Sequence, residues 1–253
     1  MSLVTASPRS ALGIDVGGSS LKLARVDTLT QALLSPFHSV PTPQPATPAT
    51  LIQLFGQLAG QIAPHDPVGI AMPCVVQHGI TRSAANIDAG WIDFDCAAAA
   101  RTALGRPVTV LNDADAAGLA EMRWGAGRGV SGTVMLLTFG TGIGSAMFRD
   151  GRLVPNTELG HLQVDGREAE HQASARVRTV ESLDWAAWAA RVNRVLAEYH
   201  ALFWPDLFIL GGGISQDFAQ FESLLKCRAP VRAAQFTAQA GAMGAALAAV
   251  EAL

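Results

Sequence analysis

The sequence lacks several features that would place it in a restricted class of protein. Its three cysteines, Cys74, Cys96 and Cys227, lie far apart and form no CxxC pair. An odd and scattered set argues against a disulfide framework and a cysteine zinc site, and it indicates reduced thiols in a cytoplasm. The N-terminus has no secretory apolar core. The most apolar stretch, 132–148, is interrupted by glycine and threonine and is too short for a membrane span. We therefore expect a cytoplasmic protein without a membrane partner.

A surplus of positive charge is also missing. The 253 residues carry a net charge of −3 at pH 7, so the composition predicts no nucleic-acid partner. Because 49% of the residues are hydrophobic and 15% are charged, we expect a globular chain rather than a disordered one. The length allows one or two domains.

Glycine, by contrast, is present in clusters. Residues 137–145, LTFGTGIGS, place three alternating glycines behind a strand-forming run. Glycine-rich turns after a strand often bind phosphate, because bare N–H groups can close on an anion. The dinucleotide-binding turn continues into a helix and the P-loop carries a Lys-Ser/Thr pair, and this stretch has neither. Residues 146–149 and the turn at 150–151 instead predict a second strand and a hairpin. The pattern is consistent with a strand–turn–strand phosphate clamp.

A similar unit occurs earlier in the chain. Residues 12–27, LGIDVGGSSLKLARVD, also predict a strand, a Gly-Ser turn and a strand. Two copies suggest two similar α/β halves that face one cleft, where ligands usually bind. The remaining pattern predicts strands at 67–73, 106–113 and 205–213, and helices at 51–63, 114–127, 181–203 and 240–253.

Five motifs occur in order at wide spacing: GIDVGGSSLK, LNDADAAGLAE, LTFGTGIGSAMFRDGRLVPNTELGH, DLFILGGGIS and AGAMGAAL. Together they resemble the motifs of the ROK family of sugar kinases, within the actin/hexokinase superfamily. PTPQPATP, LVPNTELGHL and NDADAAGLAE are similar to the polyphosphate glucokinase branch of that family. The resemblance implies an α/β fold of two duplicated actin-like/ribonuclease H-like domains with a hinge cleft. It implies an N-terminal domain at 1–112, to which the C-terminal helix 238–253 returns, and a C-terminal domain at 113–237.

The resemblance makes Asp113 the general base that takes the proton from the sugar 6-hydroxyl. Phosphoryl transfer needs one carboxylate to orient the attacking hydroxyl. An Asp that follows a strand and opens a helix also has a structural role as the N-cap, and the residues alone leave both roles open. Asp115, two residues further, would point elsewhere on a helix.

The resemblance also implies a set of sugar ligands, whose mixture of donors and acceptors suits sugar hydroxyls. Read without the family, His161 is a surface or core imidazole, Glu170 is an exposed helix residue and Asn86 is a turn residue. The implied sugar ligands are Asn86, Asn112, Glu158, His161 and Glu170.

The glycine turns are the implied phosphate sites. Asp15 would hold Mg²⁺, through water in part, although an Asp beside Gly commonly bonds to its own backbone. Lys22 could equally be a solvated edge residue. The implied phosphate-binding residues are Asp15, Gly17, Gly18, Ser19, Ser20, Lys22, Gly140, Thr141 and Gly142. Gly211, Gly212 and Gly213 would let a nucleotide approach, although a plain strand-to-helix turn also explains them.

The chain departs from the family pattern at three places. The cysteine-rich zinc loop that usually follows GH is replaced by VDGREAEHQAS, so we expect Mg²⁺ and no zinc. Cys74 stands where the family often has glycine, and Ser19-Ser20 makes the first turn poorer in glycine.

The resemblance implies transfer of a phosphoryl group from polyphosphate, ATP or both to glucose, by a homodimer. The alternatives are a strictly ATP-dependent glucokinase or glucomannokinase, and a sugar-sensing protein without catalysis. A sugar-responsive repressor is disfavoured, because only 12 residues precede Gly13 and leave no room for a helix-turn-helix.

Overall fold

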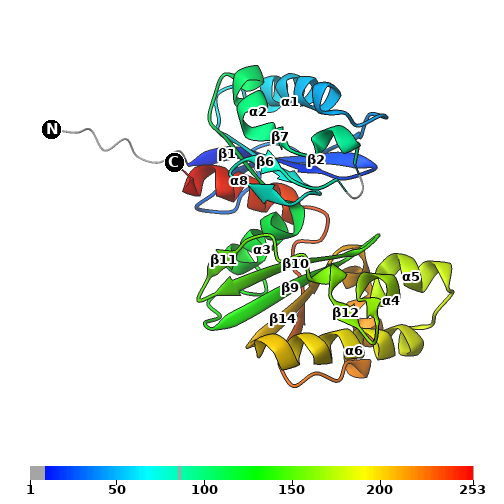
Figure 1. Cartoon of the computed structure of the whole chain (residues 1–253). Helices are drawn as coiled ribbons and strands as arrows, with labels where there is room; N and C mark the ends of the chain where they lie inside the picture. The colour runs from blue at the N-terminus through cyan, green and yellow to red at the C-terminus, as the bar shows by residue number, and fades with distance from the viewer. Residues whose placement is uncertain (1–8, 85–86, 253) are drawn as a thin grey trace. The chain divides into compact units, whose positions relative to one another are not determined.

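The structure is a computed structural model, and it describes residues 9–84 and 87–252 (Figure 1). Contacts within the chain define two compact units. Unit 1 comprises Met1–Ala120 together with Gln239–Leu253, and unit 2 comprises Glu121–Ala238. Each unit is built around one mixed five-stranded sheet.

The sheet of unit 1 has the strand order β3-β2-β1-β4-β8. Strand β1 pairs with β2 and β2 pairs with β3 in antiparallel fashion, whereas β1–β4 and β4–β8 are parallel pairs. The parallel strand β4 is buried along its whole length, as expected for a strand that is covered on both faces. The bounds are β1 Ser10–Val16, β2 Ser20–Asp27, β3 His38–Pro41, β4 Val68–Met72 and β8 Val108–Asn112.

The sheet of unit 2 repeats this arrangement, with the order β11-β10-β9-β14-β15 and the same sequence of antiparallel and parallel pairs. The predicted hairpin at 150–151 is confirmed, since Arg149 pairs with Arg152 across it. The predicted duplication of a strand–turn–strand unit is therefore confirmed as well. The bounds are β9 Thr133–Phe139, β10 Ile143–Arg149, β11 Arg152–Val154, β14 Leu207–Gly211 and β15 Val231–Ala233.

The C-terminal helix α8 (Ala240–Glu251) packs on β1 and β4 of unit 1 at very short range. A Cβ added to Gly13 or Gly69 would collide with backbone carbonyls of α8, and one added to Gly244 would collide with the carbonyl of Ala116. The small residues of α8 thus allow the helix and sheet backbones to approach closely. This confirms the expected close packing of the C-terminal helix.

Three further helices lie on the sheets of their own units. In Figure 1, α1 and α2 lie side by side on the sheet of unit 1, and α6 runs along the sheet of unit 2. We predicted a helix from residue 181, but α6 begins at Trp185 because the Asp184 side chain accepts the N–H of Ala187 and caps it. The bounds are α1 Pro48–Ile62, α2 Cys96–Leu104, α3 Asp113–Trp124, α4 Glu170–Ala173, α5 Ala175–Val180, α6 Trp185–Phe203 and α7 Phe218–Phe221.

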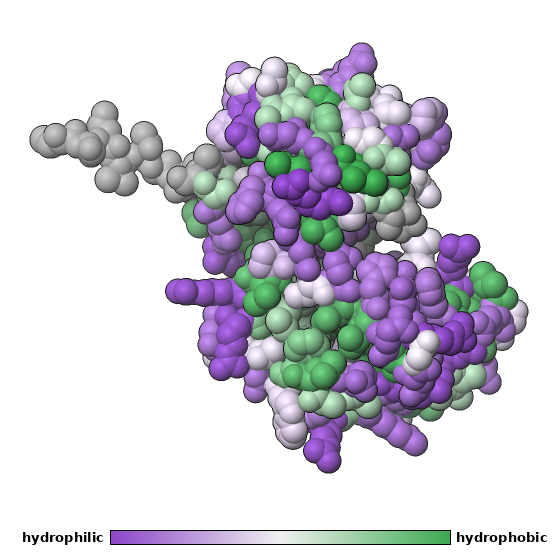
Figure 2. Space-filling view, in the orientation of Figure 1, coloured by the Kyte–Doolittle hydropathy of each residue, from purple (hydrophilic) through white to green (hydrophobic). Residues whose placement is uncertain are grey.

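Hydrophilic side chains are spread over the face of the molecule seen in Figure 2. Short strands and 3₁₀ turns complete the two units. None of the helices in the described ranges is long and apolar enough to cross a membrane. The short strands are β5 Val76–Gln77, β6 Ile80–Thr81, β7 Phe94–Asp95, β12 Gln163–Val164 and β13 Arg167–Glu168. The 3₁₀ turns are η1 Ala89–Trp91, η2 Leu159–His161, η3 Gly213–Asp217 and η4 Glu222–Leu224.

Candidate functional site

The first glycine turn joins β1 to β2 and is held by the proline-rich segment 41–48. The Gly17 N–H donates to the Ser20 carbonyl at 3.0 Å, which closes the turn. Thr42 braces it twice, because its hydroxyl donates to the Gly17 carbonyl at 2.6 Å and its N–H donates to the Ser19 carbonyl at 3.0 Å. A cavity of about 250 Å³ opens beside the turn. Its lining residues include Gly17, Gly18, Thr42, Gln44, Pro73 and Asp88.

Asp15 lies at the end of β1, next to this turn. Its side chain is 13% exposed, and Lys22 on β2 places Nζ 3.4 Å from its Oδ2. Burial raises the pKa of Asp15, while the Lys22 charge and hydrogen bond oppose that rise. Gly241 of α8 leaves room for the Asp15 carboxylate, because a Cβ on Gly241 would lie 2.6 Å from Asp15 Cγ. Lys22 is thus the ion-pair partner of Asp15 rather than an isolated edge residue.

Asn112 and Asp113 lie where β8 passes into α3. The Asn112 Oδ1 accepts the N–H groups of Ala114 at 2.8 Å and Asp115 at 3.1 Å, so Asn112 is the N-cap of α3. Its amide also donates to the Cys74 carbonyl at 3.2 Å. Asp113 is the first helical residue, is partly exposed, and accepts the N–H of its neighbour Ala114 at 2.8 Å. The sequence left open whether Asp113 caps the helix or acts as the general base. The structure assigns the capping role to Asn112.

The second glycine turn, Gly140–Gly142, lies between β9 and β10 of unit 2. The Gly140 N–H donates to the Gly142 carbonyl at 3.0 Å, and the Gly140 carbonyl accepts the N–H of Arg176. A Cβ on Gly142 would collide with the carboxylate of Glu170, which accepts the Ile143 N–H at 3.2 Å. Next to Gly140 there is open space where a Cβ would be. One glycine accommodates a carboxylate, and the other leaves its backbone open to a ligand.

The segment that carries ELGH is fixed by two buried side chains. Ser145 Oγ accepts the Leu159 N–H at 2.9 Å, and the hydroxyl of Tyr199 on α6 donates to the Leu159 carbonyl at 2.6 Å. Glu158 has left-handed backbone angles, with φ 31° and ψ 38°, which are uncommon for a residue with a side chain. Such angles persist only where the surroundings enforce them, and they cluster at functional sites.

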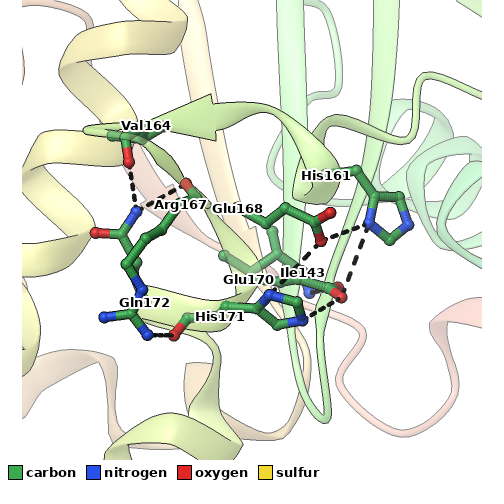
Figure 3. A network of polar contacts seen from close by, with 8 residues as sticks. All are labelled: Ile143, His161, Val164, Arg167, Glu168, Glu170, His171 and Gln172. Carbon is green, nitrogen blue, oxygen red and sulfur yellow. Dashed lines mark hydrogen bonds and ion pairs between the residues drawn. The ribbon is translucent and has the colours of Figure 1, made fainter.

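Four ionisable side chains converge beside this segment: His161, Glu168, Glu170 and His171 (Figure 3). The His161 Nδ1 lies 3.1 Å from Glu168 Oε2 and 3.9 Å from Glu170 Oε1. His171 lies 3.7 Å from Glu168 and 3.8 Å from Glu170, so it is part of the cluster. The hydrogen bond to Glu168 raises the pKa of His161. Burial raises the pKa of Glu158, and the nearby charge of His161 opposes this rise.

The same cluster could bind a cation. His161, Glu168 and Glu170 place one ligand atom each within 4.8 Å of one another. Two of these residues are also candidate sugar ligands, so a cation and a sugar would compete for them. No cysteine occurs between positions 97 and 226, and burial raises the pKa of the Cys96 thiol to about 12, which disfavours its thiolate.

The glycines after β14 have different environments. Gly212 has φ 81°, and a Cβ on it would collide with the Phe139 backbone, so this residue has a structural role in the strand-to-helix turn. Gly213 has open space at the corresponding position. Of these glycines, Gly213 is the one where a ligand could approach the backbone most closely.

The structure groups the candidate residues by unit. Asp15, Lys22, the first turn, Asn112 and Asp113 belong to unit 1, whereas the second turn, Glu158, His161, Glu170 and Gly211–Gly213 belong to unit 2. Asn86 lies outside the described residues. Glu168 and Tyr199 were not predicted from the sequence; Glu168 contacts His161 from the neighbouring hairpin, and Tyr199 contacts Leu159 across 40 positions.

Glu121 is a further residue that the sequence did not single out. It is fully buried near the C-terminal end of α3. Its Oε1 accepts the N–H groups of Gln235 at 2.8 Å and Phe236 at 2.7 Å, and its Oε2 accepts the N–H of Ala126 at 2.8 Å. These contacts join the two segments of unit 2 that lie next to its boundaries with unit 1 at Ala120 and Gln239.

A duplicated α/β fold with a glycine turn and acidic side chains on each unit defines the chain as a sugar kinase of the actin/hexokinase type. The ROK family pattern matches residues 11–181. The chain belongs to the ROK family.

Among relatives, a polyphosphate glucokinase of Mycobacterium tuberculosis is 46% identical over 243 residues, covering 96% of this chain and 92% of that protein. The crystal structure of an inorganic polyphosphate/ATP-glucomannokinase from an Arthrobacter species superposes with a TM-score of 0.91 at 43% identity, covering 97% of this chain and all of that one. A ROK glucokinase of Streptomyces griseus, solved with glucose and AMPPNP, has the same fold, with a TM-score of 0.79 at 24% identity over 94% of this chain and 98% of that one.

Proposed function

We propose that the chain is a kinase that transfers the terminal phosphoryl group of inorganic polyphosphate, and also of ATP, to the 6-hydroxyl of glucose. The observation that carries this proposal is the start of α3, where Asp113 is the first helical residue, is partly exposed and lies next to the helix cap Asn112. The names of similar proteins, polyphosphate glucokinase and polyphosphate/ATP-glucomannokinase, support the acceptor and both donors. A glucose 6-phosphate assay on purified protein tests it. Sugar binding without product from any donor would favour the sugar-sensing alternative.

In the proposed reaction, Asp113 takes the proton of the 6-hydroxyl as that oxygen attacks the terminal phosphorus. A new bond forms between the sugar oxygen and phosphorus, and the bond from phosphorus to the bridging oxygen breaks. The donor leaves one phosphate shorter. One oriented carboxylate is sufficient for this chemistry, because positioning and charge stabilisation account for most of the catalysis.

The sugar would be held by carboxylate, imidazole and amide groups, which suit a ring of hydroxyls that both donate and accept. Glu170 is already fixed by its bond to Ile143, and the ELGH segment is fixed by Tyr199, so these groups are preorganised. The proposed sugar ligands are Asn112, Glu158, His161 and Glu170, together with Asn86.

The donor phosphates would approach the two glycine turns, and Gly213 would admit a nucleotide. Kinases of this kind typically use a divalent metal cation. We propose Mg²⁺ at Asp15, because a single largely buried carboxylate beside a phosphate turn fits an ion that usually takes one or two carboxylates plus phosphate oxygens. When bound, the ion would neutralise charge on the donor. We also propose that the enzyme works in the cytoplasm and forms a homodimer. Light scattering of the purified protein tests the oligomeric state.

We expect activity to require Mg²⁺ and not zinc. The loop after Gly160-His161 carries no cysteine, so it lacks the thiolates of a structural zinc site. A chelator should abolish glucose 6-phosphate formation, and added magnesium should restore it. Metal analysis of dialysed protein should find no stoichiometric zinc. One zinc atom retained per chain would contradict this assignment.

We also expect polyphosphate to give a higher kcat/KM than ATP. A polyphosphate chain carries repeated negative charge, and of the 18 basic residues only Lys22 and Lys226 are lysines. Arginine suits a phosphate path because its planar fork meets phosphate oxygens in pairs. Screening should weaken polyphosphate binding more steeply than ATP binding, because more charge contacts are involved.

The measurement compares kcat/KM for both donors at two ionic strengths, with glucose saturating. ATP serves as the internal control for any general effect of salt on the enzyme. Activity with ATP and none with polyphosphate would reject the polyphosphate branch and leave an ATP-dependent ROK glucokinase. Replacing glucose by mannose in the same assay distinguishes a glucokinase from a glucomannokinase.

A further inference from the structure

Glu168 lies directly behind the candidate sugar ligand His161. Its Oε2 is 3.1 Å from Nδ1 of that imidazole, and its side chain is 31% exposed. A carboxylate at neutral pH only accepts hydrogen bonds, so the Nδ1 of His161 must carry the proton in this contact. The neutral ring then has a lone pair on Nε2. In Figure 3 the second ring nitrogen of His161 points away from both carboxylates.

Glu168 is itself held in place by its surroundings. It ends β13, which pairs with β12 in a two-stranded hairpin. The side chain of Gln172, which is buried, donates to the carbonyls of Val164 at 2.6 Å and Arg167 at 2.9 Å. The Ala169 N–H donates to the Leu162 carbonyl at 2.9 Å, which ties the end of the hairpin to the ELGH segment. The distance between Glu168 and His161 is therefore set by backbone and buried contacts on both sides.

The other carboxylate of the cluster has a different role. Glu170 Oε2 accepts the Ile143 N–H at 3.2 Å, and its Oε1 is 3.9 Å from His161 Nδ1, which is too long for a hydrogen bond. Among the described residues, Glu168 is thus the group within hydrogen-bond distance of His161 Nδ1. Carboxylates placed behind a functional imidazole commonly fix its tautomer and ring orientation.

We propose that Glu168 is a positioning residue that holds His161 as the Nδ1–H tautomer and presents its Nε2 to a hydroxyl group of the sugar. The proposal rests on the proposed function, since it takes His161 as a sugar ligand. It extends that function by identifying Glu168 as the group that orients His161. In the Nδ1–H tautomer, Nε2 accepts a hydrogen bond from a sugar hydroxyl.

The test combines tautomer and kinetics. In ¹⁵N-labelled protein at alkaline pH, where the imidazole is neutral, the nitrogen shifts report which nitrogen carries the proton. The His161 signal is assigned among the six histidines by its loss in His161→Gln. Wild-type protein should show Nδ1–H. Glu168→Ala should lose that preference and raise the glucose KM about 10-fold, the effect of one lost hydrogen bond, with kcat changed by less than about 3-fold.

Glu168→Gln is the rescue variant, because its amide oxygen can still accept the Nδ1–H. It should keep the tautomer and a glucose KM within about 3-fold of wild type. Glu198→Gln is the matched control, since it makes the same change of carboxylate to amide at an exposed position on α6 of the same unit. It should leave both readouts unchanged.

Three results would overturn the proposal: an Nε2–H tautomer in wild type, an unchanged tautomer in Glu168→Ala, or an equal rise of KM in the Ala and Gln variants. Zinc or magnesium bound at His161 in wild type, seen as a metal-induced shift of Nδ1, would also overturn it. If wild-type protein fails to phosphorylate glucose, the proposed function falls, while the tautomer of His161 still reports on its contact with Glu168.

Discussion

Asp113→Asn should lower kcat by about 10²-fold or more, the range usual for the loss of a general base. The amide has nearly the same shape as the carboxylate but cannot take the proton of the sugar hydroxyl. Glucose KM should change by less than about 3-fold, because the sugar ligands on the ELGH segment are untouched. Steady-state kinetics with saturating donor measures both parameters.

The contacts at the start of α3 supply the control. Since Asn112 caps the helix, Asp113→Asn should change the free energy of unfolding by less than about 1 kcal/mol. Asn112→Ala should cost about 1 kcal/mol of stability through loss of the cap. An Asp113 variant with normal kcat and clearly reduced stability would show that Asp113 serves the helix and not the reaction.

Local sequence patterns predicted the fold because its elements follow from local chemistry. The two strand–turn–strand units show alternation and glycine turns, and their sheets have the same order of antiparallel and parallel strands. The small residues of 240–253 predicted a closely packed helix, and Gly13 and Gly69 provide the matching space on β1 and β4. The error at the start of α6 came from an N-cap, Asp184, that was read as part of the helix.

The candidate site was harder to predict from the sequence than the fold, because several of its polar contacts join residues that are distant in the chain. Asp15 and Lys22 are opposite one another only through the register of β1 and β2. Tyr199 reaches Leu159 across 40 positions, and neither residue has a neighbour in sequence that indicates the contact. Periodicity describes which face of an element is buried, but it does not describe which polar group lies opposite which.

Asn112 and Asp113 show the same limit at short range. Adjacent Asn and Asp at the start of a helix are both good caps, and propensity does not choose between them. The choice depends on backbone geometry, in which Asn112 is the last strand residue and Asp113 is the first helical one. The sequence therefore located this candidate pair, and the structure assigned the capping role to Asn112.

Glu121→Ala should lower the free energy of unfolding by about 4 kcal/mol, the largest loss of stability that we expect from a single polar truncation in unit 2. The fully buried carboxylate accepts N–H groups from Ala126, Gln235 and Phe236. Its removal would leave the buried N–H of Ala126 and the partly buried hydrogen bonds of Gln235 and Phe236 without an acceptor, at roughly 1–3 kcal/mol each, partly offset by water that enters the space. Urea denaturation followed by tryptophan fluorescence measures the loss.

Amide hydrogen exchange tests the cause. Exchange of the three N–H groups that bind Glu121 should accelerate by at least about 10²-fold, because the segment 234–239 loses its main polar anchor to α3. Glu198→Ala is the matched control, since Glu198 is an exposed carboxylate on α6 of the same unit and its loss should change stability by less than about 0.5 kcal/mol. Equal stability of the Glu121 and Glu198 variants would contradict the anchoring role. So would acceleration at distant amides but not at these three, because the damage would then lie elsewhere in unit 2.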